Sequence, residues 1–224
     1  MNNTLPTSPS RRVLIHCAAA LLCAGLVGAP SAQAAKAVTV TDMGELAPGL
    51  GSFAEAVNNA GRTIGNAISP VDFQYHQVLW TNGAISDIGT CCGVGLPVHR
   101  SINLAGEFVG DYKATRVNRI PVYWNASGIA ADLPALGPYG FGTARAINNA
   151  GRIAGSSLDA VEDVHAVIWD RTSQVHDLGF MGEPTAGFRR FTEARGINAS
   201  NVVVGQGLVG SDYHAFKWVN GSYT

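Results

Sequence analysis

The sequence is poor in charged residues and has few cysteines. Only 14% of its 224 residues are charged and 46% are hydrophobic, which excludes the composition typical of disordered chains. Two of the four cysteines, Cys91 and Cys92, lie outside the N-terminal segment and are adjacent. An adjacent pair cannot join distant segments, so burial of apolar surface must stabilise the chain. A loop position without a bond, a vicinal disulfide and an intermolecular bridge all stay open for this pair.

Long hydrophobic runs are absent after residue 34. None approaches the roughly 20 residues that a membrane helix needs. Residues 1–34 have the pattern of an export signal: the pair Arg11-Arg12, an apolar run over Val13–Val27 and the small-residue site Ala32-Gln33-Ala34. We therefore predict cleavage after Ala34 and an extracellular or periplasmic chain of residues 35–224. The arginine pair resembles a twin-arginine signal without its usual downstream Phe and Lys, so both export routes stay open.

Basic residues are not in excess. The predicted signal contains two of the 15 Lys and Arg residues and none of the 16 Asp and Glu residues, so 13 basic and 16 acidic residues remain. A nucleic-acid partner would need a basic face, and this balance argues against one. The sequence also lacks a zinc spacing, a phosphate-binding loop and a nucleophile–base–orienter set. We therefore predict no metal, no cofactor and no catalytic residue.

A unit of about 45 residues is repeated four times. Its acidic landmark recurs at steps of 45, its asparagine at steps of 45, 45 and 50, and its tryptophan at steps of 44, 45 and 49. These landmarks are Asp42, Asp87, Asp132 and Asp177; Asn58, Asn103, Asn148 and Asn198; and Trp80, Trp124, Trp169 and Trp218. The repeats span about 42–86, 87–131, 132–176 and 177–224, with one insertion of about five residues in the last.

Each unit is predicted to be a four-stranded antiparallel meander. The apolar runs are short, rich in Val and Ile, and bounded by Asn, Gly and Asp, and no helical stripe occurs outside the predicted signal. Such meanders stack as the blades of a β-propeller, and an open or truncated repeat array is the alternative. The stretch "VTVTDMG" at residues 38–44 can complete the last blade as its outer strand, although "GSYT" at residues 221–224 also has the pattern of such a strand.

Two glycine positions indicate local backbone constraints. Gly61, Gly106 and Gly151 are replaced in the fourth unit by Asn201, and Gly and Asn tolerate positive φ best, so this position closes a tight hairpin. The second glycine is the same in all four units, which predicts close approach of a backbone or an aromatic ring. It stands at Gly65, Gly110, Gly155 and Gly205.

Three units have a histidine four residues before the tryptophan, on the same side of the predicted third strand. These are His76, His165 and His214. The second unit has Ile120 there, which favours packing over metal ligation or acid–base chemistry. The four tryptophans are predicted core residues. The four acidic landmarks are predicted to cap their own turns, because no calcium-loop motif surrounds them.

The ordered combination of "INNAGRIAGS", "HAVIWD" and "HDLG" resembles the HAF repeat family, which are bacterial extracellular repeat proteins named for a His-Ala-Phe triplet. The triplet is intact at His214-Ala215-Phe216, and the resemblance covers essentially the whole predicted mature chain. It also suggests a β-propeller, but it implies no biochemical function. The second unit lacks the histidine, Pro134 replaces the glycine after "DL", and Cys91-Cys92 replace an expected Leu-Gly.

Variation among the units is confined to loops, which favours a secreted, non-enzymatic binding or surface scaffold. A catalytic residue would break the pattern at one unique position. A propeller-type hydrolase or lyase acting on an extracellular polysaccharide is the alternative, and a truncated gene product without independent function is a third possibility. We expect a monomer with an extracellular carbohydrate or protein ligand.

The variable connections predict which face is functional. They join the second to the third strand and one unit to the next, and both emerge at the same edge of each meander. Charged and aromatic residues that the repeat does not require occur there: Tyr112, Lys113, Arg116 and Arg119, and Arg189, Arg190, Glu193 and Arg195. Arginines beside aromatic residues suit carboxylates, phosphates or sugars, and an ordinary solvated loop is the alternative. Arg189 and Arg190 are the first predicted contacts.

Overall fold

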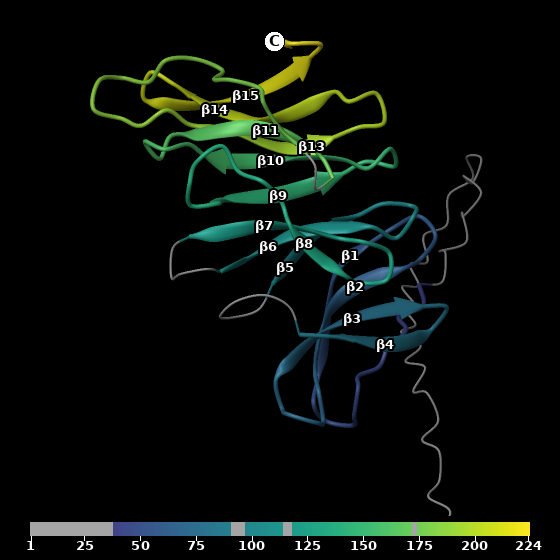
Figure 1. The fold of residues 1–224 in the computed structure, drawn as a ribbon. Coiled ribbons are helices and arrows are strands. Elements are labelled where there is room, and N and C mark those ends of the chain that lie inside the picture. Colours follow the sequence, from purple (N-terminus) through teal and green to yellow (C-terminus); the bar gives the residue numbers. More distant parts are fainter. Residues whose placement is uncertain (1–37, 91–96, 114–117, 172–173) are drawn as a thin grey trace, which may run out of the picture. The chain divides into compact units, whose positions relative to one another are not determined.

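The computed structural model describes residues 38–90, 97–113, 118–171 and 174–224. The predicted signal, the Cys91-Cys92 pair and Arg116 lie outside the described residues. The described part of the chain contains strands and no helix, and so no helix there could cross a membrane (Figure 1). Gly44–Thr224 form one compact unit.

Within these ranges, sixteen strands form four sheets, and each sheet consists of four consecutive strands that pair antiparallel in chain order. The first two sheets are β1 (Ser52–Val57), β2 (Thr63–Ile68), β3 (Tyr75–Thr81) and β4 (Ala84–Gly89), then β5 (Val98–Ile102), β6 (Phe108–Lys113), β7 (Arg119–Trp124) and β8 (Ala130–Asp132). The last two are β9 (Gly142–Ile147), β10 (Arg152–Leu158), β11 (Val164–Asp170) and β12 (Val175–Asp177), then β13 (Thr192–Ile197), β14 (Val203–Val209), β15 (Asp212–Val219) and β16 (Ser222–Tyr223). The predicted all-β, β-propeller-like array of four meanders is confirmed.

Successive sheets contact one another through their first strands. Strand β5 contacts β1, β9 contacts β5, and β13 contacts β9, while β9 and β13 also lie against further strands of the preceding sheet. Figure 1 shows the four sheets following one another in chain order. The first strands of the units are therefore neighbours, and side chains on them can meet although they are about 45 residues apart.

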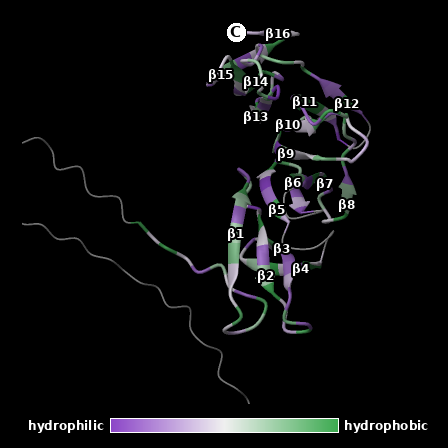
Figure 2. Ribbon diagram, turned by 90° about the vertical axis from the view of Figure 1, so that its left-hand side faces the viewer, coloured by the Kyte–Doolittle hydropathy of each residue, from purple (hydrophilic) through white to green (hydrophobic). Residues whose placement is uncertain are grey.

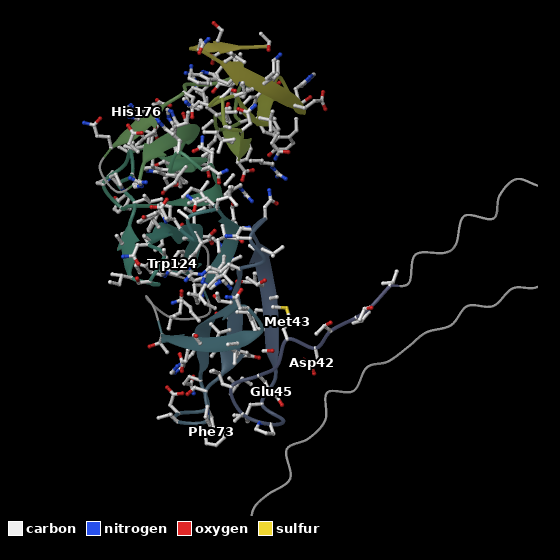
Figure 3. All side chains as sticks on the ribbon, turned by 90° about the vertical axis from the view of Figure 1, so that its right-hand side faces the viewer. Asp42, Met43, Glu45, Phe73, Trp124 and His176 are labelled. Carbon is white, nitrogen blue, oxygen red and sulfur yellow. The ribbon has the colours of Figure 1, made fainter. Side chains whose placement is uncertain are left out.

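The core lies between successive sheets. Both faces of a middle strand are covered, since Ile153 contributes to the apolar cluster with the second sheet, whereas Ala154 contributes to the cluster with the fourth. Trp80, Trp124 and Trp169 are buried, and Figure 3 shows Trp124 within the second sheet. Trp218 is only partly buried. Hydrophilic and hydrophobic residues both occur within single strands such as β1 and β2 (Figure 2).

The turn between the first two strands of each unit is built around its asparagine. The side-chain Oδ1 of Asn148 accepts hydrogen bonds from the backbone N–H groups of Ala150 and Arg152, and Gly151 follows with a φ of 79°. Asn201, at the matching place in the fourth unit, has a φ of 60°. The predicted left-handed position in this hairpin is confirmed. Asn can replace Gly there because both residues tolerate positive φ.

The second glycine of each unit lies on the second strand, where the first strand approaches closely. A Cβ atom at Gly65, Gly110, Gly155 or Gly205 would collide with a backbone carbonyl oxygen of the first strand, which belongs to Phe53, Val98, Thr143 or Glu193, respectively. Gly155 also lies under the Trp169 ring, and Gly205 under the Phe216 ring. The predicted close approach is confirmed, with the backbone in all four units and an aromatic ring in two.

The outer strand of the fourth sheet differs from the expectation. Residues 38–44 form no strand, and Ser222–Tyr223 pair with the end of β15 instead. Asn220 and Gly221 both have positive φ, so they turn the chain back onto β15 within two residues and occupy its edge. The expectation that "VTVTDMG" would complete the last blade is therefore wrong.

Candidate functional site

Each first strand contains a β-bulge opposite the close-contact glycine. The pairing with the second strand skips one residue between Ala54 and Ala56, and it does so at the same place in the other three units. The skipped residues are all charged: Glu55, Arg100, Arg145 and Arg195. A bulge leaves one residue out of the ladder and redirects its side chain. The fold thus places four charged side chains along its neighbouring first strands.

Two buried carboxylates organise the arginines of this row. Asp111 on β6 accepts from Arg100 Nε at 2.7 Å and also pairs with Arg119. Glu193 on β13 pairs with Arg145 and accepts from Arg195 Nη2 at 3.3 Å. Each carboxylate therefore joins two guanidinium groups from different strands.

The two groups lie close enough to affect one another. Burial lowers the pKa of Arg145, and the charges of Arg100 and Arg195 lower it further, while Glu193 acts in the opposite direction. An arginine stays protonated at neutral pH even so. The arrangement is therefore a cluster of four cations and two anions.

A pocket of about 260 Å³ opens beside this cluster. Its polar lining includes Arg119, Arg145 and Glu193, together with the hydroxyls of Thr143 and Ser156, which hydrogen-bond to each other at 3.0 Å. Its remaining lining residues are Asn118, Phe141, Gly142, Leu158, Val164 and Phe191. Apolar walls with a few convergent polar groups are typical of small-molecule sites.

Aromatic side chains flank the pocket on two sides. Phe141 stacks on Tyr139 with ring centroids 5.7 Å apart, and Phe191 meets Tyr213 edge to face at 5.3 Å. Tyr139 and Tyr213 are both exposed, whereas the two phenylalanines are partly buried. The rim therefore offers ring surfaces beside the arginines.

The pocket lies on the face that the variable connections predict. Arg119, Gly142 and Val164 begin their strands and Leu158 ends β10, so the lining is found where those connections emerge. Three predicted site residues, Arg119, Glu193 and Arg195, take part in the cluster or its pocket.

The other predicted site residues lie elsewhere. Arg189 pairs with Glu162 at 2.9 Å, and Arg190 pairs with Glu183 at 2.8 Å while its guanidinium lies 5.1 Å from the Phe180 ring centre. Neither lines the pocket. The Tyr112 hydroxyl hydrogen-bonds to Asp132 at 3.3 Å, and Lys113 is exposed at the end of β6.

Arg100, Arg145 and Asp111 were not predicted as site residues. The sequence contains a signal for the two arginines, because a charged residue stands three positions before the turn asparagine in every unit. In a strand whose inward positions are apolar, such a charge indicates that the residue is not in regular alternation. These positions lie on strands, so a prediction based on the variable loops does not include them.

Two of the repeated histidines lie between carboxylates. His76 contacts Asp87 through Nδ1 at 2.8 Å and Asp72 through Nε2 at 3.1 Å. Burial lowers the pKa of His76, but hydrogen bonds and charges of these two carboxylates outweigh it, so that the pKa is raised. His165 repeats the arrangement with Asp177 and Asp159 at 3.0 and 3.3 Å.

The remaining members of these repeated positions behave differently. His214 is exposed, and in the second unit Asp132 receives the Tyr112 hydroxyl instead. The backbone N–H groups of Gly89 and Gly179 donate to Asp87 and Asp177, as expected for residues that cap their own turns. Within the described ranges, no group of three His, Cys, Asp or Glu residues is arranged to hold a metal ion.

A fourth histidine, which the repeat does not reveal, is buried between the first two sheets. His99 contacts Glu55 through Nδ1 at 2.5 Å and Gln77 through Nε2 at 3.0 Å, and its ring meets those of Phe108 and Trp124 edge to face. Glu55, the bulge residue of the first unit, is thus engaged in sheet packing. The corresponding arginines of the other units pair with Asp111 or Glu193 instead.

Comparisons with known proteins find similar solved structures but no match in sequence for this chain. No protein-family model matches it, and no curated protein is similar to it. Similar solved structures include TolB from Acinetobacter baumannii, with a TM-score of 0.44, 10% identity, and coverage of 83% of this chain and 46% of that one. A triple arginine-to-alanine mutant of AofleA from Arthrobotrys oligospora has a TM-score of 0.34 and 14% identity, with coverage of 79% and 59%. The chain spans about half the length of these structures.

Proposed function

We propose that this chain is an exported, non-enzymatic binding protein built from HAF-type repeats, and that its ligand binds in the pocket beside the arginine cluster. The observation that carries the proposal is the pocket itself. Apolar walls, two hydroxyls and paired arginines converge there on the face of the variable connections. Its volume of about 260 Å³ is slightly below the lower end of the range for small-molecule pockets, which is roughly 300 Å³.

The state of the carboxylates favours binding over hydrolysis. Glycoside hydrolysis commonly uses two carboxyl groups on either side of the scissile bond. Glu193 is the one carboxylate among the described residues that line the pocket, and two arginines already hold it. Asp111 is fully buried beneath Arg100 and Arg119. These acids are suited to positioning arginines rather than to exchanging protons with a substrate.

A screen of the mature protein against polysaccharide fragments and envelope components tests the proposal. A hit is then measured against Phe191→Ala and Arg119→Ala, and against Arg152→Ala as a control. Arg152 is a half-exposed, ion-paired arginine at the opposite end of its sheet. The pocket variants should weaken binding at least tenfold and the control less than twofold. Affinity that ignores both pocket variants would move the site elsewhere, and breakdown of the bound polysaccharide would favour the hydrolase or lyase.

A further inference from the structure

The charge of the cluster is not balanced. Four arginines share two carboxylates, so the cluster has a net charge of +2 within a chain whose formal net charge is −1. The two carboxylates are also more deeply buried than the four arginines. The Asp111 and Glu193 side chains are 0% and 5% exposed, whereas the arginine side chains are between 25% and 53% exposed. A molecule that enters the pocket therefore meets guanidinium groups first.

Repulsion between the arginines further favours the binding of an anion beside the cluster. Arg100 and Arg195 both act on Arg145 with repulsive charge, and among the described residues the ion pairs of the four arginines involve only Asp111 and Glu193. An anion bound beside Arg119 and Arg145 would relieve that repulsion. A guanidinium is also the side chain that best matches a carboxylate, because its planar fork donates two parallel hydrogen bonds.

The rest of the pocket is unsuited to a bare inorganic anion. The Thr143 and Ser156 hydroxyls offer hydrogen bonds to hydroxyl groups of a ligand, and Phe141 and Phe191 offer apolar surface on which the C–H face of a sugar ring can pack. A phosphate ion could accept hydrogen bonds from the two hydroxyls, but it has no C–H face to pack on the two phenylalanine rings.

We infer that the pocket binds an acidic saccharide through its carboxylate. This inference rests on the proposed function, since it names the ligand class of the same pocket. The carboxylate lies against Arg119 and Arg145, the ring packs between Phe141 and Phe191, and sugar hydroxyls reach Thr143 and Ser156.

Calorimetric titration of the mature protein with four probes tests the inference. The probes are glucuronate, its methyl ester, glucose and inorganic phosphate. We expect glucuronate to bind at least tenfold more tightly than each of the other three. Raising the salt concentration from about 0.01 M to 0.5 M should weaken glucuronate binding several-fold and leave glucose binding unchanged, because salt screens a charged contact.

Matched arginine variants locate the contact. Arg119→Gln and Arg145→Gln should each weaken glucuronate binding at least tenfold, while Arg152→Gln, at the other end of the third unit, should stay within twofold. Arg145→Gln also removes a partner of the buried Glu193 and could prevent folding. Arg119→Gln leaves Asp111 paired with Arg100, so this variant and the salt dependence of the unmodified protein still decide the question.

Each remaining outcome overturns the inference in a distinct way. Equal affinity for glucose and glucuronate would remove the carboxylate preference and leave the proposed binding function intact. Equal affinity for phosphate and glucuronate would reduce the site to a general anion site. Failure of glucuronate to bind, with a neutral ligand found by the wider screen, would refute only the acidic ligand. If that screen also gave no ligand dependent on the pocket, the proposed function would fail as well.

Discussion

The side chain of Asn148 donates a hydrogen bond from Nδ2 to the backbone carbonyl oxygen of Asn198 at 2.9 Å, across two sheets. Asn58 donates in the same way to Asn103, and Asn103 to Asn148, at 2.8 and 3.2 Å. In the first three units, the asparagine that closes the turn with its Oδ1 therefore also binds the next unit with its Nδ2. One side chain fixes both the shape of a unit and the spacing between units.

Replacing these asparagines separates the two roles. Asn148→Ala should lower the free energy of unfolding by about 2–3 kcal/mol, because it removes the turn hydrogen bonds and also the partly buried hydrogen bond to the Asn198 carbonyl. Asn198→Ala removes only turn bonds to Ser200 and Val202 at an exposed site and should cost about 1 kcal/mol. Urea unfolding monitored by tryptophan fluorescence gives both values. Equal losses would show that the link between sheets adds nothing.

Glycines of the fourth unit provide a second matched pair. Gly205→Ala places a methyl group against the Glu193 carbonyl and the Phe216 ring, so it should lower the free energy of unfolding by about 1–3 kcal/mol or more. Gly196→Ala meets only a methyl group of Val204 at 3.2 Å, and alanine already stands at the matching positions 56 and 146. It should be neutral or slightly stabilising. A comparison of urea midpoints decides, and similar losses in both variants would contradict the close approach.

The raised pKa of His76 predicts a pH dependence of stability. Because the folded-state pKa lies above the unfolded value of about 6.5, this histidine stabilises the fold fully below that value, and the contribution is lost as pH rises through the folded pKa. Unfolding midpoints measured from about pH 5.5 to 8.5 should therefore fall less steeply in His76→Gln than in the unmodified protein. An unchanged slope would mean that Asp72 and Asp87 do not hold the proton.

The arginines of the enlarged connection distinguish the loop from the pocket. Arg189 and Arg190 form ion pairs at exposed positions, and exposed pairs contribute only about 0–1 kcal/mol. Arg189→Ala combined with Arg190→Ala should leave the melting temperature nearly unchanged. It should also leave the affinity of a pocket ligand within about twofold. A tenfold loss would support the original prediction that these two arginines are the first contacts.

Export gives a prediction that needs no ligand. Intact mass of the protein recovered from its native host should match a chain that begins at Ala35, because the site Ala32-Gln33-Ala34 follows the apolar run. The protein should be found outside the cytoplasm. A soluble cytoplasmic species that retains residues 1–34 would refute the signal.

The sequence predicts the meanders well because their pattern is local. Asn148, Gly151 and Gly155 each reflect a constraint on the local backbone. The same order of residues recurs in four units, which chance alone does not produce. The outer strand of the last sheet is harder, since "VTVTDMG" and "GSYT" both fit a strand and only proximity through Asn220-Gly221 decides between them.

The binding site is less predictable for a physical reason. A pattern of alternating residues assumes regular pairing, and the bulges at Arg100, Arg145 and Arg195 break it without changing the local composition. The partner Asp111 lies on a different strand, and Glu193 belongs to the next sheet from Arg145. The repeat spacing identifies the charged position in each unit. It does not show that these arginines and the two carboxylates lie together, because that depends on which strands are neighbours in the fold.

The bulges also separate what holds the fold from what it presents. Each skipped residue stands outside the strand register, so its side chain can differ without shifting the pairs on either side, and the chain itself uses Glu55 in one unit and arginine in three. The four bulge positions can therefore carry different side chains while the strand pairing around them stays the same. The sign of the charge is not set by these positions alone, because Asp111 and Glu193 are buried against the arginines and would have to change with them.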